Sequence, residues 1–146
     1  MSTIAISMLV FGAFGAVCGV GLVNLMALVA RGMKRPCDTV VFARGGDVRG
    51  LVADWARAHG FRHVRTDGTR QVYKRGRNVL TAPAFVEYDA DGDRHTLKAY
   101  VQIDGLLVKG DIALSGGGLL VRLPRSMARG DVNRLLASLQ QPPLPA

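Results

Sequence analysis

"VEYDADGDRHTLKAYVQID", residues 86–104, is the stretch that decides the fold class of this chain. Its Asp91-Gly92 pair lies between two runs with strand character, and Asp-Gly in that position is a strong signal for a β-hairpin. After the turn, apolar side chains recur at every second position, as on a strand with one buried face: Leu97, Ala99, Val101 and Ile103. The stretch therefore predicts two adjacent antiparallel strands.

More short strands are predicted on both sides of this hairpin. Before it, residues 61–64 and 70–75 are separated by "TDGT", a second Asp-Gly turn. The first strand of the hairpin is expected over 79–89, where Pro83 favours an edge position or a bulge because proline has no N–H to donate. After the hairpin, "GLLVKG" is interpreted as a loop or a short strand. "DIALS" and "LLVRLP", on either side of three glycines, are interpreted as a last hairpin or a bulged pair.

Two amphipathic helices are predicted at the two ends of this strand-rich region. The first has Asp47 as a suitable N-cap and Gly60 just after its last turn. Its apolar positions follow helical spacing: Val48, Leu51, Val52, Trp55 and Ala58. The second is expected over 125–139, or only from Asp131 as an N-cap, because Gly130 weakens the first turn.

The predicted fold class is α+β, with a single N-terminal transmembrane helix and a small domain of about five antiparallel strands flanked by two helices. Residues 1–35 are the anchor with its basic juxtamembrane stop, 36–46 a connector, 47–139 the cytoplasmic domain and 140–146 a disordered tail. Within the connector, residues 40–42 are either a first strand or a docking segment. The two helices should cover one sheet face and leave the other for water, membrane or a partner.

The anchor is predicted from residues 2–30, which contain no charged side chain. About 20 apolar residues suffice to cross the hydrocarbon core of a bilayer. A cleaved signal peptide fits less well, because no basic residue precedes the run and the run is too long, although residues 13–15 resemble a cleavage site. A core helix of a soluble protein would rarely run this far without a polar face.

The orientation of the anchor follows from its flanks. Arg31, Lys34 and Arg35 follow the span, and nothing basic precedes it. The positive-inside rule then puts the N-terminus outside and the domain in the cytoplasm, and we expect the bacterial inner membrane. Cys18 and Cys37 are about 28 Å apart along a helix and form no disulfide framework, which suits a cytoplasmic domain.

The anchor carries a face of small residues. Gly12, Gly15, Ala16 and Gly19 share one side of the helix, and such faces let transmembrane helices approach closely. Asn24 is expected to add a hydrogen bond between helices. The predicted partner is an integral membrane protein or a second copy of the chain. The alternative is that the glycines only reflect the high glycine content of membrane helices.

Basic residues are densest at residues 62–78, in a chain of net charge +8. Anionic lipid headgroups or an acidic protein surface are the expected partners of this hairpin, and the alternative is a solvated basic face. Nucleic acid is disfavoured because aromatic residues make up only 6% of the chain. The candidate lipid- or partner-binding residues, with those that follow the anchor, are Arg31, Lys34, Arg35, Arg70, Lys74, Arg75 and Arg77.

No motif in the sequence predicts catalysis, a metal or a cofactor. "DADGD" at 89–93 resembles a calcium loop, but its glycine comes too early and Tyr100 stands where the bidentate glutamate is needed. Ser115 precedes the three glycines, yet a strand pattern follows them rather than the helix that a phosphate site requires. We therefore predict a protein that is not an enzyme, with no catalytic residue and no metal.

Together these features predict a single-pass membrane accessory or adaptor subunit. It would associate with a larger membrane protein complex through the glycine-rich face and the basic cytoplasmic domain. The alternative is a membrane-tethered, homo-oligomeric regulatory domain that binds a ligand or lipid.

Overall fold

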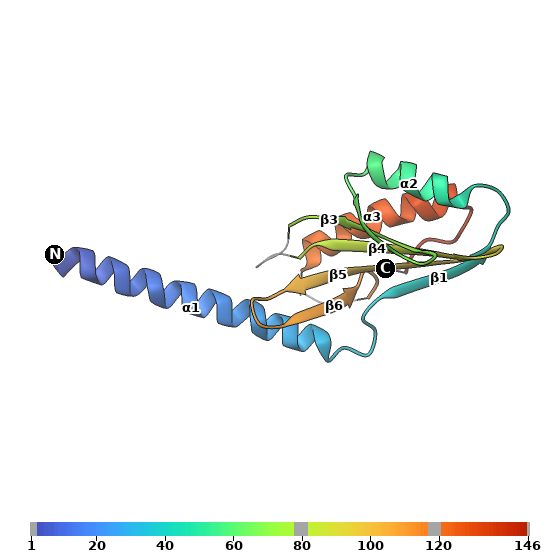
Figure 1. Ribbon diagram of the computed structural model, residues 1–146. Coiled ribbons are helices and arrows are strands. Elements are labelled where there is room, and N and C mark those ends of the chain that lie inside the picture. The colour runs from blue at the N-terminus through green and yellow to red at the C-terminus, as the bar shows by residue number, and fades with distance from the viewer. Residues whose placement is uncertain (1–2, 78–81, 117–120, 146) are drawn as a thin grey trace.

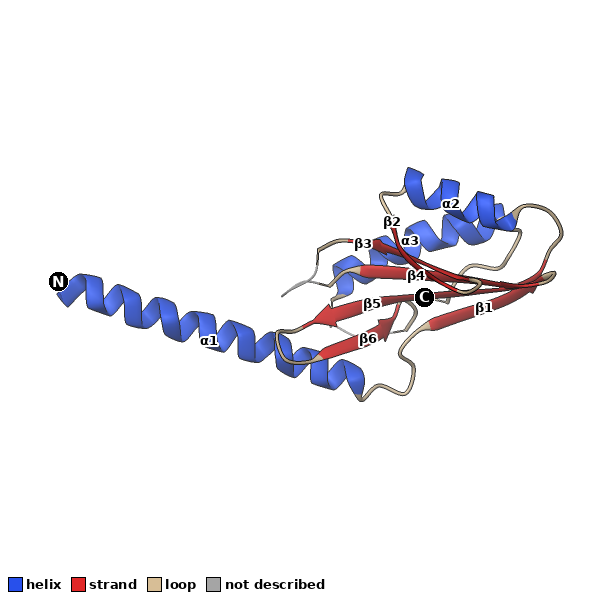
Figure 2. Ribbon diagram, in the orientation of Figure 1, coloured by secondary structure: helices blue, strands red, loops and turns tan. Residues whose placement is uncertain are grey.

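The computed structural model describes residues 3–77, 82–116 and 121–145. One long helix leads into a sheet domain that carries two further helices, so the predicted α+β class is confirmed (Figures 1 and 2). The elements in chain order are α1 (Thr3–Arg31), β1 (Asp38–Ala43), α2 (Val48–Ala58), β2 (Arg62–Asp67), β3 (Arg70–Arg75), β4 (Ala84–Asp91), β5 (Arg94–Asp104), β6 (Lys109–Ala113) and α3 (Arg122–Ser138).

The sheet has six strands in the described part of the chain, and all their pairings are antiparallel. The order is β1-β5-β4-β3-β2, with β6 also paired to β5. The predicted central hairpin is formed by β4 and β5, with Asp91 opposite Arg94 around a turn in which Gly92 has φ 59°. Along the other edge of β5, β1 pairs with its first half and β6 with its second half.

The segment expected to be a connector contains β1, which settles residues 40–42 as part of a strand. Its first residue, Asp38, is buried, and its carboxylate accepts hydrogen bonds from the backbone N–H and the hydroxyl of Ser115. The buried Arg125 of α3 donates to the carbonyls of Ala113, the last residue of β6, and of Ser115 and Gly116 just after it. These contacts join β1, β6 and α3, so the domain begins well before residue 47.

α2 and α3 pack on one face of the sheet (Figure 1). α2 begins as predicted, with the Asp47 carboxylate accepting the Gly50 N–H at 2.8 Å. Trp55 on α2 is buried, as predicted for a core residue, and its indole N–H donates to the Asp131 carbonyl of α3 at 3.1 Å. The core is the layer between this face and the two helices.

α3 corrects two expectations. It begins at Arg122, so Asp131 is not an N-cap but lies inside the helix. Packing of Ala128, Val132 and Leu135, all fully buried, offsets the cost of about 1 kcal/mol for a glycine within a helix. The strand predicted for "LLVRLP" is also wrong in its described part, because Val121 lies in a turn and α3 follows it. Residues 119–120 of that segment lie outside the described residues.

The final residues do not form the expected disordered tail where they are described. Residues 140–145 return along α3, and the Leu144 side chain is buried against the core. The Leu144 N–H donates to the side-chain carbonyl of Asn133 at 2.8 Å. An apolar side chain and one well-placed amide hold the tail, which its proline-rich composition does not indicate.

Candidate functional site at the junction of the long helix and the sheet

α1 consists of two parts with different surroundings. The free part, residues 4–22, is exposed along nearly its whole length and extends away from the domain (Figure 1). The docked part, residues 23–31, lies against β5 and β6. α1 is the one helix in the described residues that is long and apolar enough to cross a membrane. The free part alone measures about 28 Å at about 1.5 Å per residue.

The docked part packs through small side chains. Ala27 and Ala30 are fully buried and form a small apolar cluster with Ile103 of β5 and Ile112 of β6. Gly110 makes this approach possible, because a Cβ at Gly110 would lie 2.7 Å from the Ala30 Cβ and closer still to the Ala27 carbonyl oxygen. The backbones of helix and strand therefore touch directly at this point.

Asn24 fixes the β5–β6 turn to the helix. Its side-chain carbonyl accepts the N–H groups of Leu107 at 2.7 Å and Val108 at 3.1 Å, and its amide donates to the Val20 carbonyl at 2.8 Å. Gly105 leaves room for it, since a Cβ there would lie 2.8 Å from the Asn24 side-chain oxygen. The prediction that Asn24 bonds to another helix is thus corrected: its polar atoms are engaged within the chain.

The predicted small face lies on the free part of α1. A Cβ added at Gly12, Gly15 or Gly19 would meet no atom within 4 Å, and Ala16 is exposed. No described segment of the chain covers this face. A helix from another protein or another copy as its partner stays a prediction.

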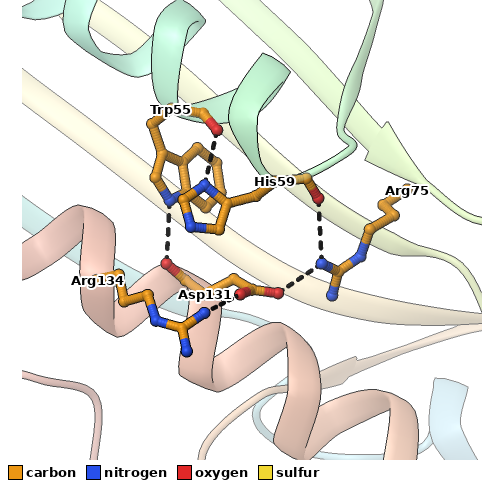
Figure 3. A network of polar contacts seen from close by, with 5 residues as sticks. All are labelled: Trp55, His59, Arg75, Asp131 and Arg134. Carbon is orange, nitrogen blue, oxygen red and sulfur yellow. Dashed lines mark hydrogen bonds and ion pairs between the residues drawn. The ribbon is translucent and has the colours of Figure 1, made fainter.

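Arg75 does not belong to a surface patch. Its guanidinium pairs with the Asp131 carboxylate and donates to the His59 carbonyl at 3.2 Å (Figure 3). It also lies over the Phe61 ring, 4.7 Å from the ring centroid. Asp131 also pairs with Arg134 at 2.8 Å. Arg75 therefore joins β3 to α2 and α3, on the face of the sheet that the helices cover.

The other basic candidates lie in three separate places. Arg70 and Lys74 are on the open face of the sheet, Arg70 at 3.8 Å from Glu87 and Lys74 over the Phe85 ring at 5.8 Å. Arg77 is exposed beyond the end of β3. The basic residues of this hairpin are therefore divided between the two faces of the sheet, because neighbours along a strand point to opposite faces. The residues that follow the anchor are all exposed, namely Arg31, Lys34 and Arg35.

The open face carries one strongly shifted tyrosine. Tyr100 stacks on Phe85, with ring centroids 5.3 Å apart, and its hydroxyl donates to the Glu87 carboxylate at 2.9 Å. Burial, and then this hydrogen bond, raise the pKa of Tyr100 well above its ordinary value. The hydroxyl therefore stays protonated through the neutral range and acts as a fixed donor within the sheet.

Within the described ranges, no group of three or more His, Cys, Asp or Glu residues could hold a metal ion. The buried polar side chains there satisfy one another, as in the Tyr88 hydroxyl and His95 ring at 2.9 Å and the contact of that ring with the Arg44 carbonyl at 2.9 Å. These groups hold strands together. The distinctive surface is the junction where α1 leaves the sheet.

Sequence reasoning missed Gly105 and Gly110, the two glycines that admit α1 to the sheet. The available signal was a glycine inside a strand pattern, which often marks the close approach of another backbone. Such a glycine identifies the position of a close approach but not the segment that approaches.

No protein-family model matches this chain, and comparison with curated proteins finds no match.

Proposed function

We propose that this protein is a single-pass membrane accessory subunit that holds its α+β domain in a fixed position at the cytoplasmic surface of a bacterial inner membrane. The observation that carries the proposal is the division of α1. Its free part has the length of a bilayer core, about 30 Å, and its docked part belongs to the domain. A plain tether would need only a flexible linker between anchor and domain.

The direct docking has a mechanical consequence. Ala27 and Ala30 sit against Gly110, and Asn24 holds the β5–β6 turn, so the domain turns and tilts with the helix. A partner that packs against the free part would therefore also fix the direction in which the domain points. This coupling suits an adaptor that presents a surface to a membrane complex.

The small face supplies the expected contact with that complex. Helices in lipid associate through close packing and hydrogen bonds, and small residues permit the closest packing. The face formed by Gly12, Gly15, Ala16 and Gly19 is uncovered within the described chain. It favours an integral membrane protein as partner, and a second copy of the same helix is the alternative, which would make the protein a homo-oligomer.

The basic residues favour the proposed orientation. Arg31 is the last residue of α1, about 10 Å beyond Asn24 along the helix axis, and Lys34 and Arg35 follow the helix. At that distance they can reach anionic headgroups on the cytoplasmic side, where each contributes about 1 kcal/mol of attraction. The divided basic residues of the sheet are not needed for this contact.

The test is purification of the tagged full chain from its native membrane in mild detergent, followed by mass spectrometry. A stoichiometric integral membrane partner supports the accessory subunit. Recovery only as a self-oligomer contradicts it and supports the homo-oligomeric alternative.

Two leucine variants and a matched control locate the contact. Gly15→Leu and Gly19→Leu should abolish co-purification by filling the small face. Gly21→Leu makes the same change about half a turn around the helix, where a Cβ also meets nothing within 4 Å, and should leave the complex intact. Equal recovery with all three variants would show that the small face is not the contact.

A further inference from the structure

The β5–β6 turn, residues 105–108, exposes two leucines at its tip. Leu106 is 62% exposed and Leu107 is 84% exposed, the highest value among the large apolar side chains of the described residues. The turn itself carries no charge. A turn exposed to water on all sides would normally carry polar residues, so two adjacent leucines here require a covering surface.

The register of the sheet carries this turn past the last paired residues of β3 and the first paired residues of β4. Arg75, Ala84, Val101 and Ile112 form one row across β3, β4, β5 and β6. β5 continues past that row to Asp104, about 10 Å at about 3.4 Å per residue. Figure 1 shows the turn beside α1 on the side toward which the free part leaves the domain.

The turn is also held at a defined height on α1. Asn24 accepts the N–H groups of Leu107 and Val108, and Gly105 lies against it. Asn24 is the second residue after the free part, whose length of about 28 Å nearly equals the hydrocarbon core of about 30 Å. The boundary between acyl chains and headgroups then falls at the level of Asn24 and of the turn tip.

The charges near this end suit a membrane surface. Lys109, which follows the turn, pairs with the buried Asp104 at 3.4 Å, so the two charges balance. Arg77 is exposed beyond the last residue of β3, at the same end of the sheet. Cations near headgroups and apolar side chains at the acyl boundary are the composition of segments that lie in the membrane interface.

We propose that residues 105–108 insert Leu106 and Leu107 into the interface of the membrane that α1 spans, giving the domain a second point of attachment. The inference rests on the proposed function only in that α1 crosses the bilayer. With two attachment points, the domain and α1, which move together, resist tilting relative to the membrane plane. The exposed leucines are thus covered by lipid, at the boundary between acyl chains and headgroups.

The experiment is quenching of tryptophan fluorescence by lipids brominated near the top of the acyl chains. The full chain is reconstituted in vesicles of phosphatidylcholine and phosphatidylglycerol, and the signal of the buried native Trp55 is subtracted. Leu107→Trp and, independently, Leu106→Trp report on the turn. Val41→Trp is the control, because Val41 is 48% exposed and pairs with Thr96 toward the opposite end of β5.

A reference within α1 separates this inference from the proposed function. Val17→Trp lies off the small face and about 8 Å inside the end of the free part, so it should be quenched if α1 spans the bilayer. We expect Leu107→Trp and Leu106→Trp to be quenched at least about twofold more than Val41→Trp, since interfacial side chains lie about 5–10 Å deep.

Each other outcome overturns the inference in a recognisable way. If Val17→Trp is quenched while both turn variants behave like Val41→Trp, α1 spans the membrane but the turn lies in water or against a protein. If Val17→Trp is not quenched, α1 does not span, and the proposed function and this inference fail together. Because both leucines are exposed, tryptophan at either position fits without displacing the core.

Discussion

The two parts of α1 use small residues in the same way but differ in what lies opposite. In the docked part, Ala27 and Ala30 face Gly110, and helix and strand backbones touch. In the free part, Gly15 and Gly19 face nothing within 4 Å. Small side chains permit close contact without supplying its partner. A small-residue pattern therefore predicts an approach, and only the fold or an experiment names what approaches.

The largest effect is expected where that contact is tightest. Gly110→Ala should lower the free energy of unfolding of the full chain by about 1–3 kcal/mol, because the new Cβ overlaps the α1 backbone and a well-packed site cannot yield without strain. The measurement is thermal unfolding of the purified protein in detergent.

Gly130→Ala provides the control for this substitution. A Cβ at Gly130 meets nothing within 4 Å, and the residue lies inside α3, where alanine is favoured by about 1 kcal/mol. It should therefore stabilise the protein or leave it unchanged. Equal loss of stability in both variants would mean that α1 does not press on Gly110.

The next effect is expected at the polar contact of the docked part. Asn24→Leu removes the acceptor of the Leu107 and Val108 N–H groups and should cost about 2 kcal/mol, since each hydrogen bond contributes about 1 kcal/mol net. The released turn should also be cleaved faster by trypsin at Lys109. Asn133→Leu is the matched control, because Asn133 holds only the tail through Leu144. If both variants were cleaved faster at Lys109, the faster cleavage could not be assigned to the contact between Asn24 and the turn, and the prediction would fail.

Features defined by near neighbours in the chain were predictable from the sequence. The Asp91-Gly92 hairpin, the Asp47 cap of α2 and the apolar spacing around Trp55 all depend on residues within a few positions of one another. Local propensity and periodicity carry enough information for such elements.

Features defined by distant residues were not predictable. Asn24 contacts Leu107, 83 residues away, and nothing within the helix distinguishes that partner from a second helix. Arg75 lies in a run of basic residues, and nothing in that run predicts its pairing with Asp131, 56 residues away. The helix-packing role of Gly12, Gly15, Ala16 and Gly19 stays a prediction. Asn24 instead bonds within its own chain, because tertiary contacts decide which polar atoms remain available.

A still smaller effect on stability is expected from a substitution on the open face of the sheet, which α1 does not touch. Tyr100→Phe removes the hydrogen bond to Glu87 and should cost about 1 kcal/mol at neutral pH. The raised pKa of Tyr100 in the folded chain means that its contribution is fully present below about pH 10, where the unfolded tyrosine is also neutral. This contribution is lost as the pH rises further, because Tyr100 then ionises in the unfolded chain while it stays neutral in the folded chain.

The measurement for Tyr100 is the midpoint of thermal unfolding as a function of pH from neutral to strongly alkaline. The variant should show a smaller alkaline loss than the parent. Tyr73 and Tyr88, whose pKa values burial also raises, contribute to the loss that remains. Identical alkaline profiles would contradict the shift at Tyr100. The docking of α1 should not change in Tyr100→Phe, so the rate of trypsin cleavage at Lys109 should equal that of the parent chain.

The smallest effect is expected in the free part, and it completes the comparison. Gly19→Ala adds the same methyl group as Gly110→Ala, but its Cβ meets nothing within 4 Å. Unfolding of the domain should therefore change by less than about 0.5 kcal/mol, as for substitutions that touch no special feature. A loss as large as that of Gly110→Ala would show that the free part also packs within its own chain. An unchanged domain, together with loss of co-purification in Gly19→Leu, would show that the small residues of the two parts serve different partners.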